Sequence, residues 1–177
     1  MKHLTFFYIG LISIIPFLTM AQNIDVAKSE VKFKIKNFGG WVNGSLPSPN
    51  ATISWNEAKP AAFSIKASIA VEGIKTGIGA RDKHLLKDDY FYSHKYPTIS
   101  FKATGATKSG NGWKAKGTLS IKGVDKEIEI PFTVKSADGI RYFEGSFSID
   151  RRDFGVGDSS FVLGDEVIVS FKLYEER

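Results

Sequence analysis

Short runs along this chain alternate apolar and polar residues with a period of two, and the apolar member is most often Phe, Ile or Val. The first run is Val31/Phe33/Ile35, and the intervening residues are mostly Lys, Glu, Ser and Thr. Because successive side chains of a β-strand point to opposite faces, each run predicts a strand with one apolar and one polar face. Further runs of this kind cover residues 63–71, 99–103, 113–121, 128–134, 143–149 and 167–173.

This pattern predicts an all-β protein. With residues 52–55 counted as a further strand, the chain offers about eight strands and no linker that would divide it. Such strands form an antiparallel barrel around a continuous apolar interior. The inward positions of that barrel are the candidate ligand-contacting wall: Phe33, Ile35, Phe63, Ile65, Ala67, Ile69, Ile99, Phe101, Ala103, Leu119, Ile121, Ile130, Phe132, Phe143, Phe147, Val169 and Phe171.

Dipeptides that tolerate a positive φ separate the runs. Asn111-Gly112 and Asp138-Gly139 each predict a hairpin, and Lys122-Gly123 predicts a third. Asn43-Gly44 is either another turn or part of one strand over residues 41–46 that bends at the glycine.

The alternation is lost between Thr76 and Tyr92. Residues 76–86 predict a short helix with Thr76 or Asp82 as its N-cap. In such a helix Arg81 shares a face with its neighbours three and four residues on. A helix in the middle of a meander has one natural place to lie, across an open end of the barrel. We therefore expect this segment to cap the barrel.

Residues 1–21 predict a cleavable secretory signal peptide. Met1–His3 is basic, residues 4–18 are almost wholly apolar, and Thr19-Met20-Ala21 offers small residues before a cleavage point at Gln22. The apolar run is shorter than the roughly 20 residues that span a bilayer. We therefore expect a mature chain of residues 22–177, a single domain without a transmembrane segment, located in the periplasm or outside the cell.

The chain contains no cysteine, so its stability must come from burial of its core. Lys and Arg number 24 against 19 Asp and Glu, and Lys2 belongs to the predicted leader. Such a surplus suits an anionic head group or membrane surface. Lysines such as Lys32, Lys34 and Lys36, however, alternate along a polar strand face, where they keep sheets soluble. Because the basic residues are scattered, nucleic acid is not an expected partner.

Motifs for catalysis are incomplete. Gly77-Ile78-Gly79 and Gly155-Val156-Gly157 begin like phosphate loops but lack a third glycine and a parallel βαβ context. The sequence has no Gly-x-Ser-x-Gly motif, and neither His84 nor His94 has an obvious serine partner for a Ser-His-Asp site. His84 and Asp88 are four residues apart, but two ligands do not make a metal site. The sequence predicts no catalytic residue, no metal and no cofactor.

A series of sequence blocks resembles the YceI-like family of lipid- and polyisoprenoid-binding proteins, over essentially the whole mature chain. The resemblance implies an extended, lipocalin-like antiparallel barrel in an exported protein, with a cavity that holds a long isoprenoid or similar amphiphile. The blocks are Arg81-Asp82-Lys83-His84-Leu85, Asp89-Tyr90-Phe91, Tyr96-Pro97-Thr98-Ile99-Ser100-Phe101, and residues 117–124, 152–157 and 164–167.

The chain departs from the family pattern near its second and third strands. Leu46 and Trp55 stand where the family tends to have Phe, and Ser48-Pro49-Asn50 makes an irregular connection. We expect the cavity wall to differ there.

Alternation alone does not distinguish a filled barrel from one with a cavity, because a barrel of about eight strands allows either. The resemblance favours the cavity. Burial of about twenty ligand carbons at ~0.8 kcal/mol each gives roughly 16 kcal/mol, against association costs of ~4–15 kcal/mol. A polar contact would then mainly set the orientation of the ligand. The candidates for the head-group contact or the cap are Arg81, His84, Leu85 and Arg152.

We therefore expect an exported protein that binds a hydrophobic small molecule or lipid, as a carrier or a buffer, with a homodimer left open. Three alternatives remain. One is an enzyme that acts on a hydrophobic substrate in the same cavity, and another is a structural barrel with a packed core. The third is a small outer-membrane barrel, in which the same alternation would place its apolar face toward lipid.

Overall fold

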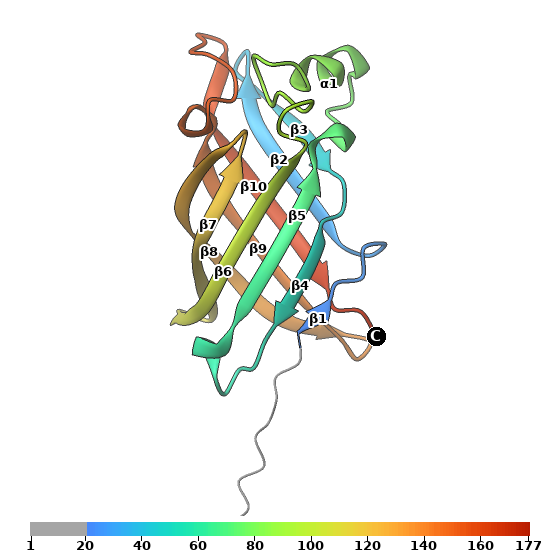
Figure 1. The fold of residues 1–177 in the computed structure, drawn as a ribbon, viewed down its shortest axis with the longest axis vertical. Coiled ribbons are helices and arrows are strands. Elements are labelled where there is room, and N and C mark those ends of the chain that lie inside the picture. Colours follow the sequence, from blue (N-terminus) through green and yellow to red (C-terminus); the bar gives the residue numbers. More distant parts are fainter. Residues whose placement is uncertain (1–20) are drawn as a thin grey trace, which may run out of the picture.

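The computed structural model describes residues 21–177, so the predicted leader lies outside the described residues except for Ala21. Within this range the chain forms ten strands, one α-helix and three 3-10 helices (Figure 1). The strands are β1 (Gln22–Asn23), β2 (Glu30–Asn37), β3 (Gly40–Leu46), β4 (Asn50–Ser54), β5 (Ser64–Ala70), β6 (Thr98–Ser109), β7 (Gly112–Ile121), β8 (Val124–Ala137), β9 (Ile140–Asp150) and β10 (Leu163–Tyr174). The helices are η1 (Pro60–Ala62), η2 (Val71–Gly73), α1 (Gly79–Leu85) and η3 (Arg151–Phe154).

One sheet contains all these strands and curls into a barrel (Figure 1). Its order is β1-β4-β5-β6-β7-β8-β9-β10-β2-β3, and neighbouring strands run antiparallel. The expected antiparallel barrel with a short helix at one end is confirmed. It has more strands than the eight expected, because β1 is too short to show a period and β3 alternates poorly.

Burial along the strands follows the predicted alternation. In β5 the side chains of Ile65, Ala67 and Ile69 face the barrel interior, while Lys66 and Ser68 are exposed. Register keeps inward residues of adjacent strands side by side, since β10 and β2 pair residue 167 with 35 and residue 169 with 33. The barrel interior is therefore continuous across neighbouring strands.

Three hairpins turn through consecutive residues with positive φ. Lys122-Gly123 (52° and 75°) and Asp138-Gly139 (52° and 75°) are at predicted positions, but the third pair is Phe38-Gly39 (49° and 76°). The β6–β7 hairpin was also predicted, although Gly110 rather than Asn111 takes the positive φ there. Asn43-Gly44 is not a turn and lies within β3.

Gly44 faces the aromatic ring of Phe33 on the neighbouring strand. A Cβ atom at position 44 would lie 2.2 Å from the Cζ atom of that ring. The glycine therefore serves a close approach between β2 and β3 rather than a change of chain direction.

Four connections meet at one end of the barrel, which we call the α1 end. They are the β2–β3 turn, the segment between β5 and β6 that contains α1, the β7–β8 turn and the β9–β10 loop (Figure 1). The predicted helix is present, but its predicted N-cap is wrong, since Ile78 occupies that position without a side-chain cap. Asp82 instead lies in the first turn, where its Oδ1 atom accepts a hydrogen bond of 2.8 Å from the Thr76 amide.

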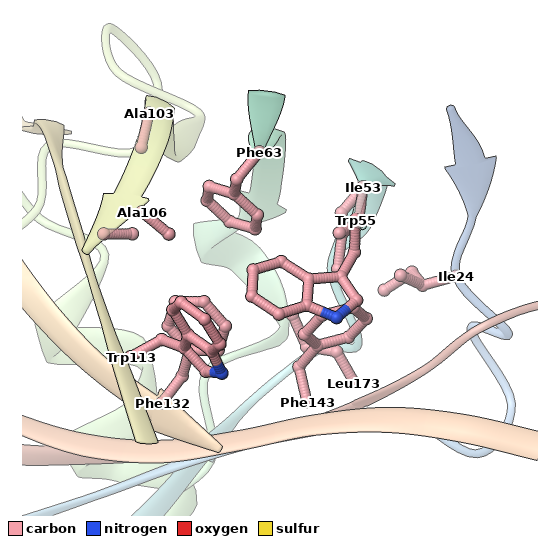
Figure 2. Packing of buried hydrophobic residues seen from close by; sticks show 12 residues of the cluster. Ile24, Ile53, Trp55, Phe63, Ala103, Ala106, Trp113, Phe132, Phe143 and Leu173 are labelled. Carbon is pink, nitrogen blue, oxygen red and sulfur yellow. The ribbon is translucent and has the colours of Figure 1, made fainter. Parts of the chain in front are cut away.

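A cluster of aromatic side chains fills the opposite part of the barrel (Figure 2). The Trp55 ring is its centre and meets four others edge to face. Its centroid lies 4.9 Å from that of Trp113, 5.7 Å from Phe132, 5.9 Å from Phe63 and 6.3 Å from Phe143. Edge-to-face pairs at these distances add to the stabilisation from area burial alone. This end of the barrel is a packed core.

Short contacts, rather than a continuous ladder between β3 and β4, close the barrel. Near the α1 end, Ser45 bridges to Lys75. At the other end residues 23–25 pair with residues 174–176, which we call the terminal latch. The Asp25 amide donates to the Tyr174 carbonyl at 2.8 Å, and the Glu176 amide donates to the Asn23 carbonyl at 2.9 Å.

An ion pair with one buried partner lies in the terminal latch. The Nε atom of Arg141 in β9 is 2.9 Å from Oε2 of Glu175, whose side chain is buried. Burial raises the pKa of Glu175 above its ordinary value, while the guanidinium of Arg141 acts in the opposite direction. The effect of desolvation on the pKa of Glu175 is therefore larger than the opposite effect of its ion pair with Arg141.

None of the helices in the described part of the chain is both long and apolar enough to cross a membrane.

Candidate functional site

The barrel interior contains a cavity of about 440 Å³, a size typical of sites for small molecules, which span roughly 300–1,000 Å³. Phe63, Phe132 and Phe143 of the aromatic cluster form its floor, and inward side chains of the strands form its wall. It extends to the α1 end, where His84 lines it and is itself exposed. The cavity therefore meets solvent beside α1.

Nearly every residue predicted for the wall lines this cavity. All come from the inward positions of strands β2 and β5 to β10, or from Phe63 just before β5. They are Phe33, Ile35, Phe63, Ile65, Ala67, Ile69, Ile99, Phe101, Leu119, Ile121, Ile130, Phe132, Phe143, Phe147, Val169 and Phe171. Their contact with a ligand remains a prediction.

Ala103 is the exception among the predicted wall residues. It faces inward and is buried, but it belongs to the packed core with Phe63 and Trp113 (Figure 2). Gly117 on β7 lies against it, since a Cβ atom at position 117 would be 2.6 Å from the Ala103 Cβ. The alternating pattern therefore identifies which residues face the interior. It does not show where along the barrel axis the packed core ends and the cavity begins.

Other cavity-lining residues were not predicted. Val31, Val167 and Leu173 continue the alternating strands and were within reach of the same pattern. A second group comes from irregular segments, where no period marks the inward side. This group includes Ile74, Tyr90, Phe91, Phe154, Val156 and Val162.

A network of hydrogen bonds fixes Arg81 at the rim of the cavity. Its Nε atom donates to Thr76 Oγ1 at 2.7 Å, and one Nη atom donates to the Thr76 carbonyl at 2.7 Å. The Thr76 hydroxyl in turn donates to Asp82. No ion pair joins Arg81 to Asp82 or to Asp89 in the described residues. The remaining guanidinium N–H groups are available to an oxygen in the cavity.

His84 lies beside Arg81 at the exposed rim. Its Nε2 atom is 2.9 Å from Oδ2 of Asp89, and the Tyr90 ring meets the imidazole edge to face. The hydrogen bond from His84 lowers the pKa of Asp89 below its ordinary value. Leu85, on the same short helix, also lines the cavity.

Arg152 does not line the cavity, so its predicted head-group role does not fit the geometry. Its side chain points outward, with Nη1 3.6 Å from Oδ2 of Asp165. The preceding residue, Arg151, is 4% exposed and lines the cavity instead. It donates to the carbonyls of Gly164, Val156 and Asp158 at 2.8–3.0 Å and to Asp165 Oδ1 at 2.8 Å. These bonds use most of its donors, so Arg151 is a structural residue.

The glycine pairs that begin like phosphate loops lie in bends and turns, except that Gly79 is the first residue of α1. Gly77, Gly155 and Gly157 have φ values of 82°, 64° and 69°. The Gly157 amide donates to the Asp89 carbonyl and the Gly155 amide to the Arg152 carbonyl, so neither is free for a phosphate. Across residues 21–177, no group of three or more His, Cys, Asp or Glu side chains is placed to hold a metal ion.

Comparison with known sequences identifies one family. A family model described as a YceI-like domain matches residues 22–174. A UPF0312 protein of Pseudomonas aeruginosa is 30% identical over 137 residues, which cover 71% of this chain and 70% of that protein. A UPF0312 protein of Azotobacter vinelandii is 31% identical over 134 residues, with the same shares covered.

Solved structures share the fold. BcnA of Burkholderia cenocepacia superposes with a TM-score of 0.80 at 27% identity, covering 85% of this chain and 98% of that chain. A YceI protein of Campylobacter jejuni gives a TM-score of 0.67 at 28% identity, covering 77% and 85%. A domain of Saccharophagus degradans described as polyisoprenoid binding gives a TM-score of 0.71 at 18% identity, covering 88% and 98%. At that identity the last likeness speaks for the fold alone.

Proposed function

The chain belongs to the YceI-like domain family, and from this premise we propose that it holds the hydrocarbon tail of a long-chain isoprenoid or similar amphiphile inside its barrel. The single observation that carries the proposal is the cavity, which is walled by apolar side chains and has its polar groups gathered at the α1 end. The polyisoprenoid-binding description of the Saccharophagus degradans domain is in line with this ligand class.

The distribution of polar groups suits an amphiphile better than a wholly apolar molecule. Phe63, Phe132 and Phe143 close the floor, so the tail of a ligand would lie deep in the barrel. Arg81 and His84 lie at the rim, where an oxygen of the head group would meet the charged guanidinium of Arg81 and a ring N–H of His84. Burial of the tail would supply most of the affinity, and the rim would set the direction in which the ligand lies.

The protein would act as a carrier or buffer, outside the cytoplasm, and would perform no chemistry on its ligand. The basic start and apolar run within residues 1–21, typical of a secretory leader, support a place outside the cytoplasm. The alternative of a barrel filled by its own side chains is disfavoured by the cavity above the aromatic cluster.

Mass spectrometry under non-denaturing conditions tests the proposal. Protein purified from its native host is expected to carry a discrete additional mass, which organic solvent extracts as an amphiphile with a long hydrocarbon chain. The same protein after delipidation is expected to regain that mass on mixing with the extract. A protein that carries no extractable ligand and takes none up would overturn the proposal.

A further inference from the structure

Exposed apolar side chains gather at one end of the barrel. Seven large apolar residues are exposed among the described residues, and only Val26 lies away from the α1 end. Globular proteins leave single apolar residues exposed as a matter of course, but a group on adjoining loops indicates a surface for an apolar partner. The residues at the α1 end are Phe38, Trp41, Ile78, Val124, Phe161 and Val162.

Phe38 occupies a position that is unfavourable for folding. It is 80% exposed and has a φ of 49°, in a turn where the equivalent residues are Lys122 and Asp138. A bulky side chain is rare in this left-handed conformation, which favours Asn, Asp or Gly. Because the ring gains no burial in compensation, its presence is explained by something outside the folded chain.

The exposed residues adjoin the opening of the cavity. The Phe38 amide donates to the Val162 carbonyl at 2.8 Å, which joins the β2–β3 turn to the β9–β10 loop. Val162 is 41% exposed and also lines the cavity, and the preceding Phe161 is fully exposed. The apolar surface and the cavity therefore share a boundary.

Exposed lysines lie at the same end of the barrel, two of them against Trp41. The Nζ atoms of Lys34 and Lys36 lie 4.9 Å and 5.5 Å from the Trp41 ring centroid. Lys83 on α1 and Lys87 just after it are exposed, and within residues 21–177 none of the four lysines forms a salt bridge. Exposed aromatic rings and unpaired lysines at one end of a molecule are the combination by which proteins adsorb to anionic bilayers.

We propose that the α1 end docks on an anionic lipid bilayer, with Phe38 and Phe161 inserted among the lipid head groups and acyl chains and the lysines against lipid phosphates. This surface goes beyond the proposed ligand binding and does not depend on it. A second copy of the chain fits less well, because it would bring the lysines of two molecules face to face. Docking sets the mouth of the cavity against the membrane.

Vesicle binding tests the proposal. The variants are chosen so that loss of membrane binding can be told apart from loss of stability. The protein and its variants are all purified with the same N-terminus. Any effect of residues 1–21 on vesicle binding is therefore the same for each. They are mixed with vesicles of phosphatidylcholine and phosphatidylglycerol in equal parts, and with vesicles of phosphatidylcholine alone. The bound fraction is measured by flotation at low and high salt.

Wild-type protein is expected to bind the anionic vesicles, with loss of binding at high salt. Phe38→Asn combined with Phe161→Ser should lower the partition coefficient at least about tenfold, because both inserted rings are lost. Phe38→Asn alone should keep or raise the melting temperature, since Asn suits its conformation. Val26→Ser, which removes an exposed apolar residue at the opposite end, should leave binding unchanged.

Fluorescence of Trp41 gives a second measurement. Trp55 and Trp113 are buried in the aromatic cluster, so lipids brominated on their acyl chains should quench only Trp41 when vesicles bind. A Trp41→Phe variant should remove the quenched component and leave the rest of the emission.

Three results would overturn the proposal. They are no binding of wild-type protein to anionic vesicles, equal binding of the Phe38→Asn/Phe161→Ser and Val26→Ser variants, and a wild-type dimer in sedimentation that the double variant abolishes. Mass spectrometry of the extractable ligand distinguishes membrane docking from ligand binding in the cavity. A double variant that retains its extractable ligand but leaves the vesicles supports docking, whatever the cavity holds.

Discussion

Small side chains on the inner face determine where the barrel is hollow. Ala67 lies on the cavity wall, opposite Phe101 in the neighbouring strand. Ala103 also points inward, two residues further along that strand, but is packed among the aromatic cluster and against Gly117. The same residue type therefore has open space at one position and close neighbours at the other.

Replacement of these two alanines by Phe is predicted to have opposite consequences. Ala67→Phe should fill part of the cavity and displace the ligand with little loss of stability. Ala103→Phe should leave ligand binding largely intact and destabilise the fold by ~1–3 kcal/mol or more, because close-packed interiors resist added volume. Thermal melting with mass spectrometry of both variants checks this. Equal destabilisation by both would show that the interior at position 67 is filled.

Arg151 and Arg152 are adjacent, but only the first is buried. Arg151→Ala removes the donors for three carbonyls and for Asp165, so it should lower the free energy of unfolding by about 3 kcal/mol. Arg152→Ala, the matched control, should cost less than about 1 kcal/mol, as is usual for exposed ion pairs. Urea denaturation of both variants measures the difference. A larger effect at Arg152 would contradict this assignment.

Sequence reasoning could not distinguish these two arginines, because η3 breaks the period-two pattern that assigns a side to each residue. The block that resembles the YceI-like family begins at Arg152 and does not include Arg151. The strand residues of the cavity wall, in contrast, follow directly from alternation, since a residue's parity within a strand fixes its face.

At the scale of elements, two turns show how far residue type alone predicts where the chain reverses. Asp138-Gly139 was predictable because both residues favour a positive φ, whereas Phe38-Gly39 was not, since Phe is a poor turn residue. Asn43-Gly44 has a good turn composition but lies within β3, where the glycine makes room for Phe33. Such a close approach depends on the neighbouring strand and leaves no local signal.

The segment from Thr76 through α1 is predicted to depend on Arg81 for its local order. Arg81→Ala removes two hydrogen bonds to Thr76, so amide exchange over residues 76–86 should accelerate by about tenfold, the effect of about 1.4 kcal/mol of local stability. The melting temperature should change little. Lys83→Ala on the same helix should leave exchange unaltered. Loss of the whole fold in Arg81→Ala would give this residue a larger structural role than its contacts indicate.

At the scale of the whole molecule, the family and the antiparallel barrel were predictable from sequence, because both rest on many residues that agree. The strand count and the way the barrel closes were not. β1 contains two residues, and its pairing with β4 depends on residues about thirty positions away along the chain. Pairing between segments so far apart in the sequence cannot be predicted from the alternation of residues within either segment.

Glu175 makes the terminal latch sensitive to pH. Burial raises its pKa above the ordinary value near 4.5, so the folded protein binds more protons than the unfolded chain between the two values. The contribution of Glu175 to stability should therefore be fully present below about pH 4 and fall as pH rises through the raised pKa. Urea denaturation across this range measures the difference in unfolding free energy between wild type and Glu175→Gln.

As pH rises, the wild type should lose unfolding free energy relative to Glu175→Gln, and the loss should level off above the raised pKa of Glu175. Arg141→Gln, which removes the partner that opposes the shift, should displace the change to higher pH. A difference that is constant with pH would show that Glu175 titrates normally in the folded state.

The terminal latch also governs when the barrel is complete during synthesis. A hydrogen bond joins Asn23 to Glu176, so β1 meets part of its final partner only after β10 has been made. Until then, every nascent chain presents the inward faces of its strands as an open apolar sheet with unpaired edges. Such intermediates are prone to aggregation. The apolar wall that lines the cavity of the finished barrel is thus an aggregation-prone surface of the unfinished chain until β10 has been made.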